Sequence, residues 1–83
     1  MSGITGSTQR IWVRAGRVYH LPEGCVRIAV LRGTAWLSMD GRDVVVKGGE
    51  QFVLPRRHGL ALVSGMWGED LFLALGVAEA AAA

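Results

Sequence analysis

The sequence predicts an all-β fold, a sandwich or barrel of seven or eight short antiparallel strands. Glycine and proline interrupt the chain at intervals of roughly 8 residues, a spacing typical of such folds. Between these breaks lie short runs rich in β-branched, aliphatic and aromatic residues, which favour strands. The length of 83 residues limits the chain to one small domain.

The expected strands follow one another along the chain with short connections. They cover residues 10–14, 17–21, 25–31, 34–39, 43–46, 51–54, 60–64 and 70–75. We expect a flexible N-terminal segment over residues 1–9, a single domain over 10–76 and an Ala-rich tail over 77–83. The tail has high helix propensity but is too short to form a stable isolated helix.

The clearest local signal is the pair Asp40-Gly41, which suits a two-residue hairpin turn with positive φ at both central positions. In the strand before this turn, alternation sends Ala35, Leu37 and Met39 to the core and Trp36 to the other face. The same alternation in strand 25–31 predicts an inner face of Val26, Ile28 and Val30.

Alternation fails in three segments, in which both faces of the strand are apolar. These segments are 44–46, 60–63 and 71–75. Strands of this kind are usually buried on both sides. A two-layer fold of this size has one interior, so we expect a second copy of the chain to cover the remaining face, in a dimer or a higher homo-oligomer.

Charge and cysteine content exclude several classes of protein. The net charge is +2, and the only adjacent cations are Arg56-Arg57, followed by His58. We treat these three residues as a candidate anion-binding loop and do not expect nucleic acid as a partner, because clustered cations with stacking aromatics are missing. No apolar run is long enough to span a membrane, and no secretory signal is recognisable, so we expect a cytoplasmic protein. The lone Cys25 cannot form an internal disulfide.

A resemblance narrows the fold. Gly33, Trp36-Leu37, Asp40-Gly41, Gly48-Gly49-Glu50 and Leu54-Pro55 follow one another in an order that resembles a cupin-like β-roll, and more narrowly the small bacterial family DUF2917, whose function is unknown. The match runs from about Ala15 to Gly65. The resemblance implies a cupin-like β-roll and no defined activity.

Comparison with catalytic cupins implies that no metal is bound. Counted from Gly33, the two histidine positions of their first motif hold Met39 and Gly41. Gly49 and Pro55 fit the second motif, but Leu60 stands at its histidine position. A lone imidazole such as His58 cannot replace a set of three or four ligands. We therefore expect neither a metal nor another cofactor.

Three functions remain as hypotheses. We expect a non-enzymatic binding or assembly module, because no nucleophile, base and orienting group can be assembled with recognised spacing. The first alternative is a small-molecule sensor or carrier that uses the roll interior, with a candidate pocket of Trp36, Met39, Phe52 and Trp67. The second is a metal-free isomerase or lyase, for which His20, His58 and Arg27 are the available groups.

Overall fold

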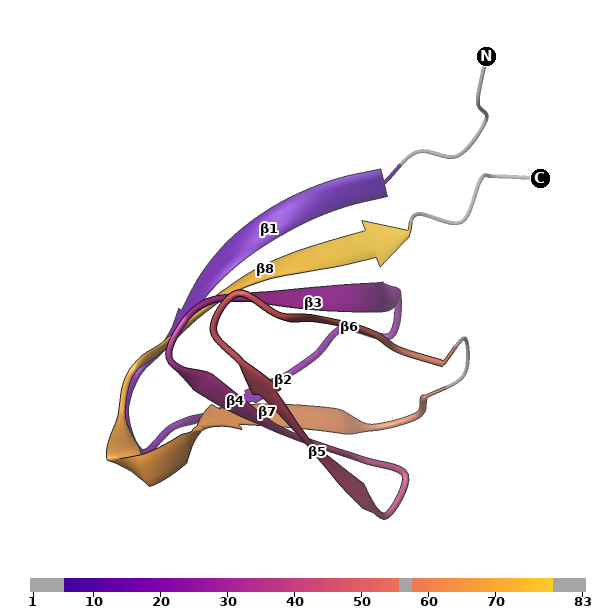
Figure 1. The fold of residues 1–83 in the computed structure, drawn as a ribbon. Helices are drawn as coiled ribbons and strands as arrows, with labels where there is room; N and C mark the ends of the chain where they lie inside the picture. Colours follow the sequence, from indigo (N-terminus) through magenta and orange to yellow (C-terminus); the bar gives the residue numbers. More distant parts are fainter. Residues whose placement is uncertain (1–5, 56–57, 79–83) are drawn as a thin grey trace, which may run out of the picture.

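Two four-stranded antiparallel sheets face each other in the computed structural model, which describes residues 6–55 and 58–78 (Figure 1). The strands are β1 (Gly6–Val13), β2 (Val18–His20), β3 (Cys25–Arg32), β4 (Thr34–Met39), β5 (Arg42–Lys47), β6 (Gln51–Val53), β7 (Ala61–Gly65) and β8 (Leu71–Ala78), with a 3₁₀ turn η1 (Met66–Gly68) between β7 and β8. Sheet I has the strand order β1-β8-β3-β6, and sheet II has the order β2-β7-β4-β5.

Eight antiparallel strands divided in this way form a double-sheet roll, the architecture that cupins share. The expected all-β fold is therefore confirmed. Consecutive strands mostly lie in opposite sheets, and the β4–β5 hairpin is the exception. Among the residues described, no helix is long and apolar enough to cross a membrane.

The core lies between the two sheets and is built from one side of each strand. Ala35, Leu37 and Met39 of β4 point into it, as alternation predicts, and Leu71, Leu73 and Leu75 of β8 meet them from sheet I. The buried hydrophobic side chains form one continuous cluster, so the interior of the roll is filled by the chain itself.

The β4–β5 hairpin has the predicted two-residue turn. Asp40 and Gly41 have φ values of 53° and 74°, and Met39 pairs with Arg42 across the turn. Positive φ at both central positions defines the turn type that matches the twist of paired strands. The hairpin register then places Trp36 beside Val45 on the outer face of sheet II.

The strand ends differ from the prediction. β1 begins at Gly6 and β8 extends to Ala78, since these residues pair with each other and continue the β1–β8 ladder. The strand ends expected at residues 10 and 75 were therefore wrong by a few residues on each side. Backbone pairing does not require a core-facing side chain, and this is why the Gly/Ser/Thr-rich opening joins a strand. The first five residues and the tail beyond Ala78 lie outside the described residues.

The predicted inner face of β3 was wrong at one position. The β3–β8 register shifts between Cys25 and Arg27, so that Val26 is an extra residue in the ladder. Such a bulge reverses the alternation on one side of it. As a result Cys25 is buried beside Ile28 and Val30, whereas Val26 is exposed.

Candidate association surface

The outer face of sheet II carries exposed apolar side chains from three of its four strands. Val18 of β2, Trp36 of β4 and Val45 of β5 are each about half exposed, and Leu62 of β7 lies between them. Exposed apolar groups are normal when scattered, but a contiguous group on one face marks an interaction site. We call this surface the sheet II patch.

A hollow crosses the sheet II patch because its central strand carries a small side chain. Ser64 of β7 pairs with Val18 on one side and Trp36 on the other, so two larger side chains flank a short one. One part of the hollow, of about 200 Å³, extends toward Leu62 and Ser38. A cavity of about 150 Å³ can hold a benzene ring. The hollow can therefore accept an aromatic side chain.

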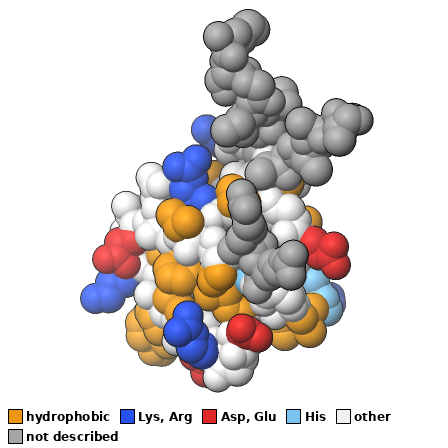
Figure 2. Space-filling model, turned by 90° about the vertical axis from the view of Figure 1, so that its right-hand side faces the viewer, with side chains coloured by type: hydrophobic (Ala, Val, Ile, Leu, Met, Phe, Trp, Pro, Cys, Tyr) orange, Lys and Arg blue, Asp and Glu red, His pale blue; other side chains and the backbone are white. Residues whose placement is uncertain are grey.

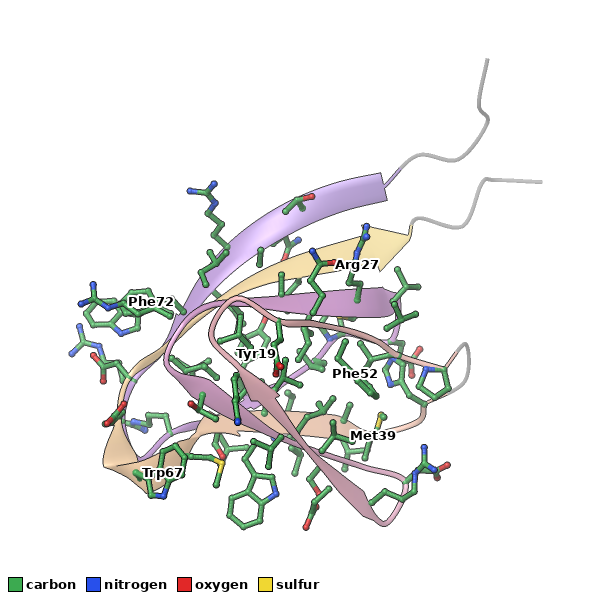
Figure 3. The ribbon with its side chains drawn as sticks, viewed as in Figure 1. Tyr19, Arg27, Met39, Phe52, Trp67 and Phe72 are labelled. Carbon is green, nitrogen blue, oxygen red and sulfur yellow. The ribbon has the colours of Figure 1, made fainter. Side chains whose placement is uncertain are left out.

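The other part of the hollow, of about 410 Å³, reaches η1. Trp67 forms its rim together with Arg17 and Met66, and Trp67 is largely exposed. Its backbone has φ 55° and ψ 27°, a left-handed conformation that is unusual for an aromatic residue. The strained turn directs the indole outward at the lower left of the molecule (Figure 3).

The structure divides the four residues of the predicted pocket between two environments. Trp36 and Trp67 line the hollow on the outer face of sheet II. Met39 and Phe52 instead point between the sheets, where Met39 is buried and Phe52 packs against the core (Figure 3). The prediction that these four residues line one pocket was therefore wrong. Residues 36 and 39 are an odd number of positions apart on one strand, so their side chains point to opposite faces of the sheet.

Sequence reasoning missed two residues of this surface, Val18 and Ser64. Both are short side chains whose importance comes from their pairing with Trp36 across β7. The strand order β2-β7-β4 joins segments that are far apart in the chain. The local pattern contains no signal for that order.

The predicted anion-binding loop is only partly within the described residues. Arg56 and Arg57 lie outside them. His58 is only 3% exposed, with Nε2 lying 3.0 Å from the Cys25 carbonyl oxygen and Nδ1 2.9 Å from that of Gly59. A carbonyl oxygen only accepts, so which of the two contacts is a hydrogen bond depends on which ring nitrogen carries the N–H. His58 fastens the β6–β7 connection to the start of β3 and is not available to an anion.

The remaining candidate groups for chemistry lie far apart. His20 is exposed on the outer face of sheet II, whereas Arg27 projects from the outer face of sheet I (Figure 3). Burial raises the pKa of the Cys25 thiol, opposed in part by a backbone hydrogen bond with Arg27. Within residues 6–55 and 58–78 no three His, Cys, Asp or Glu side chains gather as metal ligands would.

The outer face of sheet I differs in character from the sheet II patch. Its shallow hollow, of about 180 Å³, has a floor of small residues bordered by Thr8, Arg27 and Gln51. At one end Phe72 stacks on Trp12, with ring centroids 5.6 Å apart, and the guanidinium of Arg14 lies over the indole, 4.4 Å from the ring centroid. Figure 2 shows one end of the sandwich, where separate positive and negative side chains lie around a group of hydrophobic ones.

Comparison with known proteins places this architecture among solved structures. No family model and no curated protein matches the chain. The crystal structure of the conserved SPY1581 protein of unknown function from Streptococcus pyogenes has a similar fold, with a TM-score of 0.74 and 17% sequence identity. The match covers 90% of this chain and 65% of that one, so this chain spans slightly less than two thirds of SPY1581. At that identity the likeness establishes the fold alone.

Proposed function

We propose that this chain is a non-enzymatic assembly module that binds a second copy of itself through the sheet II patch. One observation carries the proposal: Val18, Trp36 and Val45 form an exposed apolar row on a sheet face that the other residues described in the structure leave uncovered. Burial of such a row in a two-fold interface removes the same apolar surface from both copies.

The size of the patch predicts a dimer that depends on concentration. Four strands about 4.8 Å apart, each with about four residues at about 3.4 Å, give a flat footprint of roughly 20 by 15 Å. A standard interface buries about 800 Å² on each partner. Even with protruding indoles the patch is smaller than a standard interface, so we expect weak and transient association.

The two alternatives receive less support from the geometry. A sensor or carrier that uses the roll interior needs internal space, but core side chains fill the interior. A ligand would have to bind in the outer hollow beside Trp36 and Trp67. An isomerase or lyase that uses His20, His58 and Arg27 needs these side chains to converge, but two lie on opposite faces and the third is buried.

We also propose membership in the DUF2917 family. The residues of that resemblance occupy positions that a roll of this kind requires. Gly33 has φ 91°, and a Cβ there would lie 2.7 Å from the Asp70 carbonyl oxygen. Asp40-Gly41 forms the β4–β5 turn, and Gly49, with φ 88°, lies where the chain crosses between the sheets.

Sedimentation velocity over a concentration series tests the assembly proposal. The samples are the wild type, Val18→Lys and the matched control Val53→Lys. Val18 is 57% exposed on edge strand β2, and Val53 is 71% exposed on edge strand β6 of the other sheet. A charge at either site is solvated in the monomer, but only the one at residue 18 would be buried by the proposed contact.

We expect the wild type and Val53→Lys to dimerise with the same dissociation constant and Val18→Lys to remain monomeric. A wild type that stays monomeric up to millimolar concentration contradicts the proposal. So does a Val18→Lys variant that dimerises as well as the wild type. Native mass spectrometry of the same samples records any retained small molecule, which would favour the carrier alternative.

A further inference from the structure

The outer face of sheet II is a grid whose rows are fixed by strand register. Residues paired across β2, β7, β4 and β5 lie side by side in that order. The first row contains Val18, Ser64, Trp36 and Val45. The second row contains His20, Leu62, Ser38 and Asp43. In both rows the two halves differ in size or in charge.

Consider a two-fold axis that runs parallel to the strands, midway between β7 and β4. It would place each residue of a row opposite a different residue of the same row in the partner subunit. Such an axis exchanges β2 with β5 and β7 with β4, and it leaves the position along the strand unchanged. Trp36 then lies over the partner subunit's Ser64, where the hollow of about 200 Å³ receives the indole. Val18 meets the partner subunit's Val45, so the first row buries apolar groups against apolar groups.

An axis across the strands gives a poorer fit. It leaves each strand opposite itself, so that the bulky Trp36 meets the partner subunit's Trp36 while the hollow over Ser64 faces an identical hollow. Shifting that axis between the rows places Val45 against the partner subunit's Asp43. Protein interfaces pack as densely as protein interiors, which disfavours the first arrangement. The second would bury the Asp43 carboxylate against an apolar side chain, which is costly for an unpaired charge.

The second row adds a polar contact to the same arrangement. His20 lies at the β2 edge and Asp43 at the β5 edge, and both are exposed. Three strand spacings of about 4.8 Å separate these edges, so the two side chains do not meet within one chain. Under the axis along the strands, His20 lies opposite the partner subunit's Asp43, and this contact occurs twice in each dimer.

We propose that two copies pair face to face about an axis parallel to the strands, with Trp36 in the partner's hollow and His20 against the partner's Asp43. This inference rests on the proposed function and adds the register of the contact. Opposite polar groups at the two edges favour this register over a slipped one.

Complementation between two variants tests the register. His20→Glu would set a carboxylate against the partner's Asp43, and Asp43→Arg would set a guanidinium against the partner's His20. Each variant alone is expected to dimerise about tenfold more weakly than the wild type, because two unfavourable contacts form in each dimer. In the heterodimer of an equimolar mixture, the new carboxylate faces the new guanidinium, and the remaining pair is the original His20–Asp43 contact.

Native mass spectrometry separates the species, because the two variants differ in mass. Recovery of a heterodimer at near wild-type affinity supports the proposed register. A mixture that dimerises no better than its components overturns the register but leaves the proposed function standing, provided that the wild type dimerises. A monomeric wild type removes both. Circular dichroism confirms that each variant is folded, as expected for two exposed positions.

Discussion

Truncation of Trp36 to alanine is the most direct perturbation of the proposed contact. The side chain lies in the middle of the sheet II patch and is 46% exposed. Its buried part packs on the sheet, while its exposed part is available to a partner. The substitution removes the indole and leaves the small Ser64 hollow beside it enlarged and shallow.

The exposed area sets the magnitude of the effect. A whole tryptophan buries up to about 250 Å², so the exposed fraction represents about 115 Å². At about 25 cal/mol per Å² this area contributes about 3 kcal/mol for each indole. A two-fold dimer contains two indoles, but ordering costs reduce the sum. A loss of about 3 kcal/mol in total corresponds to an increase in Kd of about a hundredfold.

The assay is sedimentation equilibrium, with thermal unfolding of each variant measured in parallel. Trp12→Ala is the matched control, because Trp12 is 51% exposed on the outer face of the other sheet. Trp12 stacks on Phe72 and donates an Nε1–H hydrogen bond to Asp70, 3.1 Å away. Trp12→Ala should therefore lower stability and leave the dimer Kd unchanged, and Trp36→Ala should have its main effect on the Kd.

Equal dissociation constants for the wild type and Trp36→Ala would refute this reasoning. A weakening of the dimer by Trp12→Ala of the same size as that by Trp36→Ala would also refute it. That result would place the contact on sheet I or attribute the loss to general destabilisation. The contact is assigned to the outer face of sheet II only if Trp36→Ala raises the Kd while Trp12→Ala lowers stability and leaves the Kd unchanged.

Three further predictions concern the fold. By urea denaturation, Gly33→Ala should lower the free energy of unfolding by about 2–3 kcal/mol and Gly49→Ala by about 1 kcal/mol. Both glycines have φ near 90°, but only at Gly33 would the new Cβ lie 2.7 Å from a backbone oxygen. Equal losses for the two variants would contradict a clash at Gly33. His58→Phe should cost about 1–3 kcal/mol by the same assay, because the ring N–H that donates to a backbone carbonyl oxygen is lost. Unchanged stability would contradict this role of His58. Burial raises the pKa of the Cys25 thiol, so the contribution of this thiol to the free energy of unfolding is present below the ordinary thiol pKa and is lost as the pH rises from about 9. The Cys25→Ala variant should therefore lose less stability over that pH range than the wild type. Chemical denaturation at several pH values measures the difference.

Local sequence patterns predicted the strands well because each strand carries its own alternation and its own turn residues. The β4–β5 hairpin is the clearest case, since Asp40-Gly41 determines the turn and the turn determines which face Leu37 occupies. The bulge at Val26 escaped prediction because it depends on the pairing of β3 with β8. A bulge is a property of two strands, and one strand carries no mark of it.

The candidate site was predicted less well for the same reason. The sequence indicated Trp36 and Trp67 as candidate pocket residues, and both line the outer hollow. Their grouping with Met39 and Phe52 was wrong because it did not consider on which side of the sheet each side chain lies. The hollow itself arises from Ser64, a residue with no chemical signal of its own. Its role follows only from the two neighbours that strand order places beside it.

The doubly apolar strands fall into two kinds, and the difference bears on the proposed assembly. On β8 the outward Phe72 is covered within the chain, because Trp12 stacks on it and Arg14 covers Trp12 in turn. On β5 the outward Val45 is half exposed, and its neighbour Trp36 is exposed as well. Both strands carry the same sequence pattern, but in sheet I the edge strand β1 covers Phe72. Sheet II has only the short β2 at the corresponding edge, which adds Val18 to the exposed row and covers none of it. In the proposed dimer, sheet II of the second copy would cover the exposed row, which the edge strand β2 leaves open.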